Sequence, residues 1–390
     1  MKALDKANYK LKLVRVQRLI NIKIAKAYHT VSNEALCILT GSTLIAIKIE
    51  EAAELYQLTR GSRKEEAMID LDTKVKHWLH PAEMTYILTD NNEDASTIQI
   101  FTDGSMTEQG VGAGIAIFRS GIHTESLKYR LNKRCTNNQA EQLAIPKSLE
   151  YTEKVQTEDK TATIYTDSRT ALDSLKNNNI HTFLIDEIRR KVTEMEQIDW
   201  KIYFWWVKAH DGIQGNELTD SLAKEAVTNE DITPCYSKVS KSVVKSELEV
   251  ISVENWQSEW DQTAKEKLTK DYLPRVSERL NMKINLTQNF TTMVTGHGNI
   301  KAYLHRFKII ETPTCPYGNK DQSIDHLLFE CEIQKKERAR LISAVSKSDG
   351  WPTSKYTLTR KQYKTYARFT NHISFVKLRI HPTKRMRSSK

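Results

Sequence analysis

Residues 97–118 read TIQIFTDGSMTEQGVGAGIAIF, and this stretch decides the fold. It contains two runs in which apolar residues alternate with small or polar ones, IQIFTDGS and VGAGIAIF, a pattern typical of β-strands. Glycines at 110, 112, 114 and 121 mark the turns, and a third strand is expected near 126–131. The sequence therefore predicts a meander of three strands.

The segment that follows the meander alternates between helical and strand patterns. Its expected elements are a helix near 136–151, a buried strand in ATIYTDS (162–168), helices at 168–176 and 183–195, a strand in WKIYFWWV (200–207) and a last helix near 215–227. Ser168 can cap the helix that it precedes. This order predicts an α/β fold, a mixed five-stranded sheet with flanking helices, preceded and followed by mainly helical segments.

Four carboxylates fall where such a fold would bring them together. They are Asp103 at the end of the first strand, Glu141 in the first helix, Asp167 at the end of the fourth strand and Asp220 in the last helix. Hard divalent cations such as Mg²⁺ prefer oxygen ligands, and two of them can activate water and stabilise the leaving oxygen of a phosphodiester. A single carboxylate is more often a solvated surface residue, so the metal-site hypothesis rests on the set. His210, in the loop after the last strand, is a candidate proton carrier.

The motifs around these residues carry a family resemblance. FTDGS, TNNQAE, YTDS and KAHDGIQGNELTDSLAKEA occur in this order, with His210 ten positions before Asp220. Residues 96–228 thereby resemble the type 1 ribonuclease H family. The resemblance implies a ribonuclease H-like fold and an endoribonuclease that hydrolyses the RNA strand of RNA–DNA hybrids, leaving a 3′-hydroxyl and a 5′-phosphate.

The resemblance also implies roles for individual residues. Asp103, Glu141, Asp167 and Asp220 would hold two Mg²⁺ ions, or Mn²⁺ in their place, and His210 would assist proton movement or product release. Asn137, Asn138 and Asn216 match family positions that contact the substrate. Asn137 and Asn138 have an alternative interpretation as helix N-caps. Trp205 and Trp206 alternate along their strand, so one of them is expected in the core.

One residue departs from what this site needs. Pro146 lies five residues after Glu141 in the same predicted helix. It removes the backbone hydrogen bond to Gln142, at a cost of roughly 3 kcal/mol. We therefore expect reduced stability rather than lost catalysis.

Net charge separates four regions of the 390-residue chain. Residues 1–95 hold 14 basic and 13 acidic side chains, 96–228 hold 16 and 19, 229–331 hold 13 and 14, and 332–390 hold 16 and 3. The overall charge of +10 therefore resides in the last region, a basic tail. An accessory nucleic-acid contact is predicted there, with a solvated tail as the alternative, from aromatic residues interleaved with basic ones: Tyr356, Tyr363, Tyr366 and Phe369 among Arg360, Lys361, Lys364 and Arg368.

Cys315, His326 and Cys331 have the appearance of a zinc site near the start of that tail. A structural zinc usually has four ligands, and Tyr317 stands where a second short-range Cys is expected. His297 or His305 could supply the missing ligand. The alternative is a small helical pair with two buried thiols.

The whole arrangement resembles the C-terminal part of a non-LTR (LINE-type) retrotransposon polyprotein. The match consists of a helical remnant of the reverse-transcriptase thumb at 1–95, with AYHTVSNEALCILTG, the ribonuclease H domain at 96–228, and a helical region with an incomplete Cys/His knuckle at 229–331. No Tyr-x-Asp-Asp polymerase motif occurs, so this chain is not expected to synthesise DNA. The resemblance implies association with a reverse transcriptase.

Other classes of protein fit poorly. Five scattered cysteines argue against a disulfide scaffold and for a reducing compartment. No membrane span or secretory signal is expected. An intracellular location is expected, and Lys384, Arg385 and Arg387 favour the nucleus. The rival functional hypothesis is a decayed element copy that only binds nucleic acid; the sequence indicates no oligomeric state.

Overall fold

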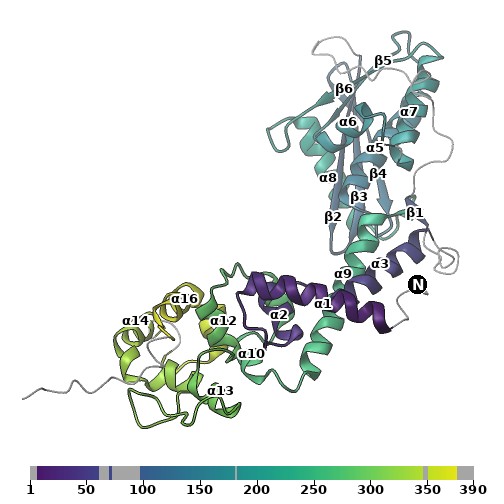
Figure 1. Ribbon diagram of the computed structural model, residues 1–390. Coiled ribbons are helices and arrows are strands. Elements are labelled where there is room, and N and C mark those ends of the chain that lie inside the picture. Colours follow the sequence, from purple (N-terminus) through teal and green to yellow (C-terminus); the bar gives the residue numbers. More distant parts are fainter. Residues whose placement is uncertain (1–6, 61–69, 73–96, 181, 346–349, 376–390) are drawn as a thin grey trace, which may run out of the picture. The chain divides into compact units, whose positions relative to one another are not determined.

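The computed structural model describes residues 7–60, 70–72, 97–180, 182–345 and 350–375. These residues form two compact units, one of residues 55–247 and the other of residues 1–54 together with 248–390. Figure 1 shows the path of the chain through the two units, coloured along the sequence. The described helices include none that is long and apolar enough to cross a lipid bilayer.

The first unit is built on a mixed sheet of five strands. The strands are β2 (Ile98–Thr107), β3 (Gly110–Arg119), β4 (Ile122–Leu131), β5 (Thr161–Thr166) and β6 (Lys201–Trp206). Their order across the sheet is β4-β3-β2-β5-β6. The β2–β3 and β3–β4 pairs are antiparallel, whereas β2–β5 and β5–β6 are parallel. The predicted meander and the predicted five-stranded α/β fold are both confirmed.

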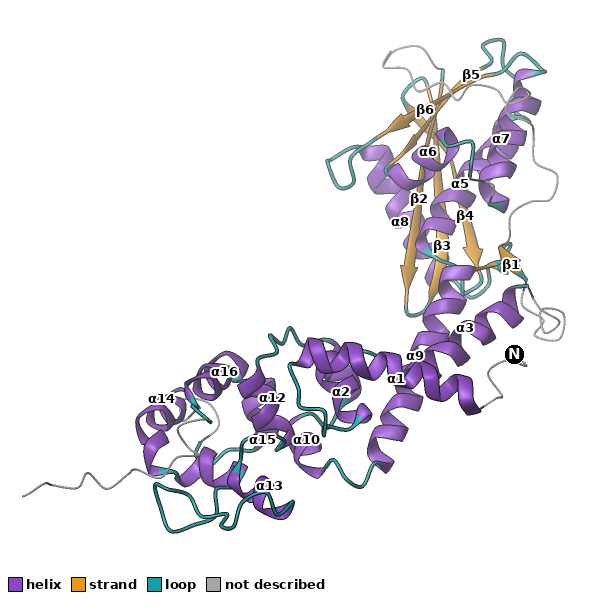
Figure 2. Cartoon of the chain, in the orientation of Figure 1, coloured by secondary structure: helices purple, strands orange, loops and turns teal. Residues whose placement is uncertain are grey.

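Helices cover both faces of this sheet. One face packs against α5 (Asn137–Thr152), α6 (Arg169–Lys176) and α7 (Phe183–Glu196) through the larger apolar core, and α8 (Gln214–Thr228) covers the other face around Phe101 and Leu222. Figure 2 shows α8 and α5 on opposite sides of the strands. A two-stranded parallel sheet joins β1 (Leu71–Asp72) to β7 (Val239–Ser240).

The second unit is helical and combines residues from both ends of the chain. Its helices are α1 (Ala7–Ala25), α2 (Asn33–Thr40), α3 (Ile45–Thr59), α9 (Lys241–Gln262), α10 (Lys267–Tyr272), α11 (Val276–Leu280), α12 (Gln288–Thr295), α13 (Lys301–Arg306), a π-helical turn η1 (His326–Glu330), a 3₁₀ turn η2 (Glu332–Gln334), α14 (Lys335–Val345), α15 (Lys355–Arg360) and α16 (Tyr363–His372); α3 and α9 extend across the boundary between the units.

One apolar core holds the helical unit together. Side chains of α2 share it with Trp256 and Trp260 of α9 and with Tyr366 and Phe369 of α16. Arg279 donates from its Nη2 to the carbonyl oxygen of Leu39, which ties α11 to α2. The segments that the sequence presents as separate regions thus fold as one unit, because neither end can bury its apolar face alone.

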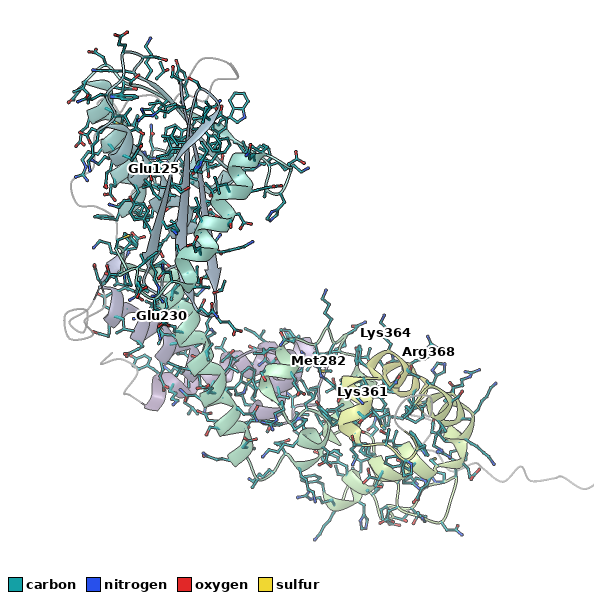
Figure 3. All side chains as sticks on the ribbon, turned by 180° about the vertical axis from the view of Figure 1, so that it is seen from behind. Glu125, Glu230, Met282, Lys361, Lys364 and Arg368 are labelled. Carbon is teal, nitrogen blue, oxygen red and sulfur yellow. The ribbon has the colours of Figure 1, made fainter. Side chains whose placement is uncertain are left out.

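The C-terminal segment differs from the solvated tail considered as an alternative. Tyr366 and Phe369 are buried in the core, and the Tyr366 hydroxyl donates to the Tyr272 hydroxyl at 2.7 Å. These aromatic rings therefore cannot stack on nucleic-acid bases, and that interpretation is wrong for them. The basic side chains of Lys364 and Arg368 remain exposed on α16 (Figure 3). Lys384, Arg385 and Arg387 lie outside the described residues.

Candidate active site

Two of the four predicted carboxylates lie side by side at one edge of the sheet. The parallel strands β2 and β5 pair in a register that sets Thr102 opposite Thr166. The next residue on each strand is Asp103 on β2 and Asp167 directly after β5. Neighbouring strands are about 4.8 Å apart, so the register alone brings these two carboxylates together.

Glu141 reaches the same place because α5 packs very closely on β2. A Cβ atom added to Gly104 would lie 2.6 Å from the backbone nitrogen of Glu141 and 2.9 Å from its Cγ. Only glycine leaves room for this approach. Asp103 thus supplies one carboxylate, and Gly104 leaves room for α5, the helix that carries Glu141.

Asp220 comes from the opposite face, on α8. This helix lies tightly against β3, because a Cβ atom on Gly112 would lie 2.6 Å from the carbonyl oxygen of Ala223. Gly112 and Gly114 lie inside β3 and leave room for α8, so the prediction that these two glycines mark turns is wrong. The carboxylate of Asp220 accepts a hydrogen bond from Lys224 Nζ at 2.7 Å, one helical turn later.

The carboxylates influence one another electrostatically. Burial raises the pKa of Asp103 to about 7, and the nearby charges of Asp167, Asp220 and Glu141 add to the rise. Burial also raises the pKa of Glu141 and that of Asp167. Clustered carboxylates in a partly buried site favour protonation or a bound cation over leaving all the charges uncompensated.

Two neighbouring side chains fix the position of Glu141. The Ser168 hydroxyl donates to Glu141 Oε2, and Asn137 Nδ2 donates to Glu141 Oε1 at 2.8 Å. Both bonds lower the pKa of Glu141 and so oppose the effect of burial. Ser168 also caps α6, as the sequence predicts, by accepting from the Ala171 backbone nitrogen at 3.2 Å.

His210 lies in the loop after β6 and is exposed to solvent. Its backbone has φ of +55°, and Gly212 two residues later has φ of +77°. The two left-handed residues turn the loop sharply between β6 and α8. The charge of His210 lowers the pKa of Asp167, which places the imidazole within electrostatic range of the carboxylates.

The three predicted substrate contacts have different surroundings. Thr136, rather than Asn137 or Asn138, caps α5, and it forms a reciprocal capping box with Gln139. The N-cap interpretation of the two asparagines is therefore wrong. Asn137 bonds to Glu141, and Asn138 is half-buried with a buried Oδ1 that has no partner in the described structure. Asn216 is only 3% exposed.

Sequence reasoning missed a cation–π pair beside the carboxylates. The Arg169 guanidinium lies 4.0 Å from the centre of the Trp206 ring, and Trp206 Nε1 donates to the Asp167 carbonyl oxygen at 3.0 Å. The expectation that Trp205 or Trp206 lies in the core is wrong, because the buried residues of β6 are Ile202 and Phe204. The basic residue directly after Asp167-Ser168 was the available signal.

The donor set suits a hard cation. The four side chains offer carboxylate oxygens, which are the ligands that Mg²⁺ and Mn²⁺ prefer. Among the described residues, no three of these carboxylates bring ligand oxygens within 4.8 Å of one another. The second predicted set, Cys315, His326 and Cys331, does meet that limit.

Comparisons with known proteins agree with this geometry. The family model for RNase H matches residues 95–228. A retrovirus-related Pol polyprotein from the type-1 retrotransposable element R1 of Popillia japonica is 29% identical over 206 residues, 52% of this chain and 78% of that protein. Ribonuclease HI of Campylobacter jejuni is 32% identical over 141 residues, 33% of this chain and 90% of that protein.

A solved structure, RNase H1 from the halophilic archaeon Halobacterium salinarum NRC-1, is 20% identical with a TM-score of 0.26, covering 33% of this chain and 96% of that one. The match to the family model spans the strands and helices that supply every residue of the carboxylate site. The chain belongs to the ribonuclease H family, with its ribonuclease H domain in a sequence homologous to R1-type non-LTR retrotransposon Pol polyproteins.

Proposed function

We propose that residues 96–228 are an active endoribonuclease that hydrolyses the RNA strand of RNA–DNA hybrids. The observation that supports this most directly is the electrostatic influence of Asp167, Asp220 and Glu141 on Asp103, which adds to burial in raising the pKa of Asp103 to about 7. A structural role for the site would not require four acidic side chains whose charges oppose one another.

Asp103, Glu141, Asp167 and Asp220 would hold two Mg²⁺ ions. Bound there, the ions would supply positive charge that activates a water molecule and stabilises the leaving oxygen. The charges of the three other carboxylates all raise the pKa of Asp103, so bound positive charge would stabilise its ionised form. The chain's own contribution is rigid placement, through the register of β2 and β5 and the close approach of α5 at Gly104.

The reaction breaks the bond between phosphorus and the 3′ oxygen of the RNA. The oxygen of a water molecule bonds to phosphorus, which leaves a 5′-phosphate and a 3′-hydroxyl. His210 is exposed and near Asp167, so it can take up or deliver the proton that this exchange requires.

Selection of the RNA strand would rest on contacts to its 2′-hydroxyls, which are exposed in the wide minor groove of a hybrid. Asn137 and Asn138 lie at the start of α5, next to Glu141, and Asn138 retains a buried oxygen with no partner among the described residues. Asn216 also matches a family contact position, but its side chain is buried. Its burial favours an indirect role, in which Asn216 holds the start of α8 in place.

A single assay tests the proposal. The full chain is incubated with a hybrid whose RNA strand is labelled, with Mg²⁺, next to Asp103→Asn and Asp173→Asn, the latter an exposed acidic residue on α6. We expect cleavage by the parent and by Asp173→Asn, and none by Asp103→Asn. Absence of cleavage by the parent, with hybrid binding retained, would favour the nucleic-acid-binding module instead.

A further inference from the structure

The helical unit contains a cavity of about 600 Å³. Its walls come from the loop after α1, the start of α10, the loop between α12 and α13, and α13 itself. Cavities of this volume are typical of sites for small ligands, in which an apolar wall carries a few polar groups. Every lining residue belongs to the helical unit, and the nuclease site uses none of them. The function proposed above therefore leaves this cavity unexplained.

The loop between α12 and α13 forms one wall of the cavity and is turned by glycine. Residues 296–298 read Gly-His-Gly, and both glycines have left-handed backbones, with φ of +74° at Gly296 and +137° at Gly298. Only glycine adopts such angles readily. His297 lines the cavity, and its Nδ1 lies 3.0 Å from Thr30 Oγ1 and 3.3 Å from the Tyr303 hydroxyl oxygen. This wall is therefore held by contacts with α13 and with the loop after α1.

Aromatic rings continue this wall to an exposed rim. The centre of the His297 ring lies 4.9 Å from that of Tyr303, and the centre of the Tyr303 ring lies 5.0 Å from that of Phe307. Phe307 lines the cavity and is nevertheless 54% exposed, whereas Phe290 and Phe369 of the same unit are buried. Exposed aromatic rings beside a cavity provide a surface on which a nucleic-acid base can stack.

Positive charge lies beside these rings. Lys265 and Arg306 both line the cavity and are exposed, and neither forms an ion pair with a described residue. The Arg306 guanidinium lies 5.9 Å from the centre of the Phe307 ring. Burial lowers the pKa of His297 and the charge of Arg306 lowers it further, so this positive charge acts on the cavity wall. Unpaired lysine and arginine side chains at the edge of a cavity favour an anionic ligand such as a phosphate.

The cavity also contains a buried acceptor. Glu266 is the one acidic side chain among the described residues that line it, and it is only 7% exposed. Its carboxylate forms no hydrogen bond or ion pair with a described residue, and it does not cap α10. A buried carboxylate without hydrogen-bond donors is costly. A ligand that presents N–H groups to Glu266 is therefore favoured in this cavity.

Among the nucleic-acid bases, guanine matches that requirement. Its Watson–Crick edge presents N1–H and N2–H side by side, and one carboxylate can accept from both. Adenine, cytosine and uracil each place an acceptor next to the donor on this edge, and that acceptor would oppose the carboxylate. Hypoxanthine lacks the N2 amino group and keeps only one of the two donors. The carboxylate therefore selects guanine, whereas the aromatic surface alone would accept any base.

We propose that this cavity binds a guanine nucleotide. The carboxylate of Glu266 accepts from N1–H and N2–H of the base. The rings of Tyr303 and Phe307 provide the stacking surface, and Lys265 and Arg306 contact the phosphate. The same contacts suit a nucleotide within a single strand and a free mononucleotide. The proposal goes beyond the nuclease activity and is independent of it, since every residue in it belongs to the helical unit.

The test compares guanine with hypoxanthine on the unaltered full chain, without added Mg²⁺. Fluorescence anisotropy measures binding of short labelled oligouridylates whose central nucleotide is guanosine or inosine, and calorimetry measures binding of GMP and IMP. We expect guanosine to bind about 10- to 100-fold more tightly than inosine. Saturable binding of GMP would identify a free nucleotide as a ligand, and a preference confined to the oligonucleotides would identify a nucleotide within a strand. Absence of a guanosine preference in both formats would overturn the proposal.

Variants then locate the preference in the cavity. Glu266→Gln keeps the shape of the side chain but replaces one acceptor with a donor, so it should remove the preference, whereas Glu254→Gln, exposed on α9, should retain it. Phe307→Ala should weaken binding of both oligonucleotides about 10-fold and leave the preference intact. Ile309→Ala, at an exposed apolar residue outside the cavity, is its control. A preference that persists in Glu266→Gln, or binding that is equal in Phe307→Ala and the parent, would overturn the site.

Discussion

The Ser168 hydroxyl makes two hydrogen bonds with different roles: it accepts from the Ala171 backbone nitrogen, which caps α6, and it donates to the Glu141 carboxylate on α5. The residue directly after Asp167 therefore holds the carboxylate of another element. In this way the end of β5 positions two of the four acidic side chains, one through the backbone and one through a side chain.

Replacing Ser168 tests this connection. Ser168→Ala should cost about 1 kcal/mol in the free energy of unfolding through the lost cap. It should also raise the Mg²⁺ concentration needed for half-maximal cleavage, since the lost hydrogen bond no longer lowers the pKa of Glu141. Ser168→Thr, which keeps the hydroxyl, should restore both. Normal Mg²⁺ dependence in Ser168→Ala would contradict the positioning role.

The raised pKa of Asp103 predicts how stability depends on pH in the absence of metal. The folded state binds the Asp103 proton up to about pH 7, whereas the ordinary value is 3.8. Between these values the folded state holds more protons, so its free energy of unfolding falls as pH rises from about 4 to about 7, by at most about 4 kcal/mol. Chemical denaturation of Asp103→Asn at both pH values should show a smaller fall. An identical fall in the variant would exclude Asp103 as its source.

Metal binding should oppose that loss. Because ligand carboxylates must be deprotonated, the apparent affinity for Mg²⁺ should rise as pH increases through about 7, where Asp103 gives up its proton. Adding Mg²⁺ should therefore raise the melting temperature more at pH 8 than at pH 6. Chelation with EDTA should reverse the gain, and Asp103→Asn should show neither effect.

Because α5 packs so closely on β2, a single methyl group added at Gly104 should strongly reduce both stability and hybrid cleavage. Gly104→Ala would place a Cβ atom 2.6 Å from Glu141 N, and overpacking of this kind costs about 1–3 kcal/mol. It should also displace Glu141 and reduce the rate of hybrid cleavage. Gly110→Ala is the matched control in the same sheet, since its Cβ atom would have no neighbour closer than 3.8 Å. Equal cleavage rates for the two variants would contradict the need for glycine at 104.

Pro146 lies inside α5, buried, and the helix runs on to Thr152. Pro146→Leu restores a backbone donor to the Gln142 carbonyl and should raise the free energy of unfolding by up to about 3 kcal/mol, with cleavage unchanged. Pro146→Ala, which adds no bulk to the core, should also gain stability. Melting by circular dichroism measures both, and stability equal to that of the parent would refute the expectation.

The exposed basic residues of α16 are the part of the C-terminal region that can still form the predicted accessory contact with nucleic acid. If Lys364 and Arg368 contact phosphates, Lys364→Gln with Arg368→Gln should weaken hybrid binding and reduce its dependence on salt by about one counterion for each contact. Deleting the whole region would instead unfold the helical unit, because Tyr366 and Phe369 lie in its core. Lys10→Gln, exposed on α1, is the control. An unchanged salt dependence would argue against the contact.

Much of the nuclease domain could be predicted from sequence because its signals are local. Alternation along β2 and β3, the Ser168 cap and the spacing from His210 to Asp220 each involve residues close in the chain. The helical unit could not be predicted in this way. Its core pairs residues near 36 with residues near 366, and no local pattern records which distant helix covers an apolar face.

The sequence by itself predicted the succession of strands and helices along the chain and the four candidate carboxylates, because periodicity and motif spacing are properties of the chain. Only the tertiary structure decided which side chains serve them. The partnership of Ser168 and Asn137 with Glu141, the stacking of Arg169 on Trp206, and the meeting of two thiols with His326 all depend on contacts across elements. Such contacts are set by close packing in three dimensions, which a linear pattern does not encode.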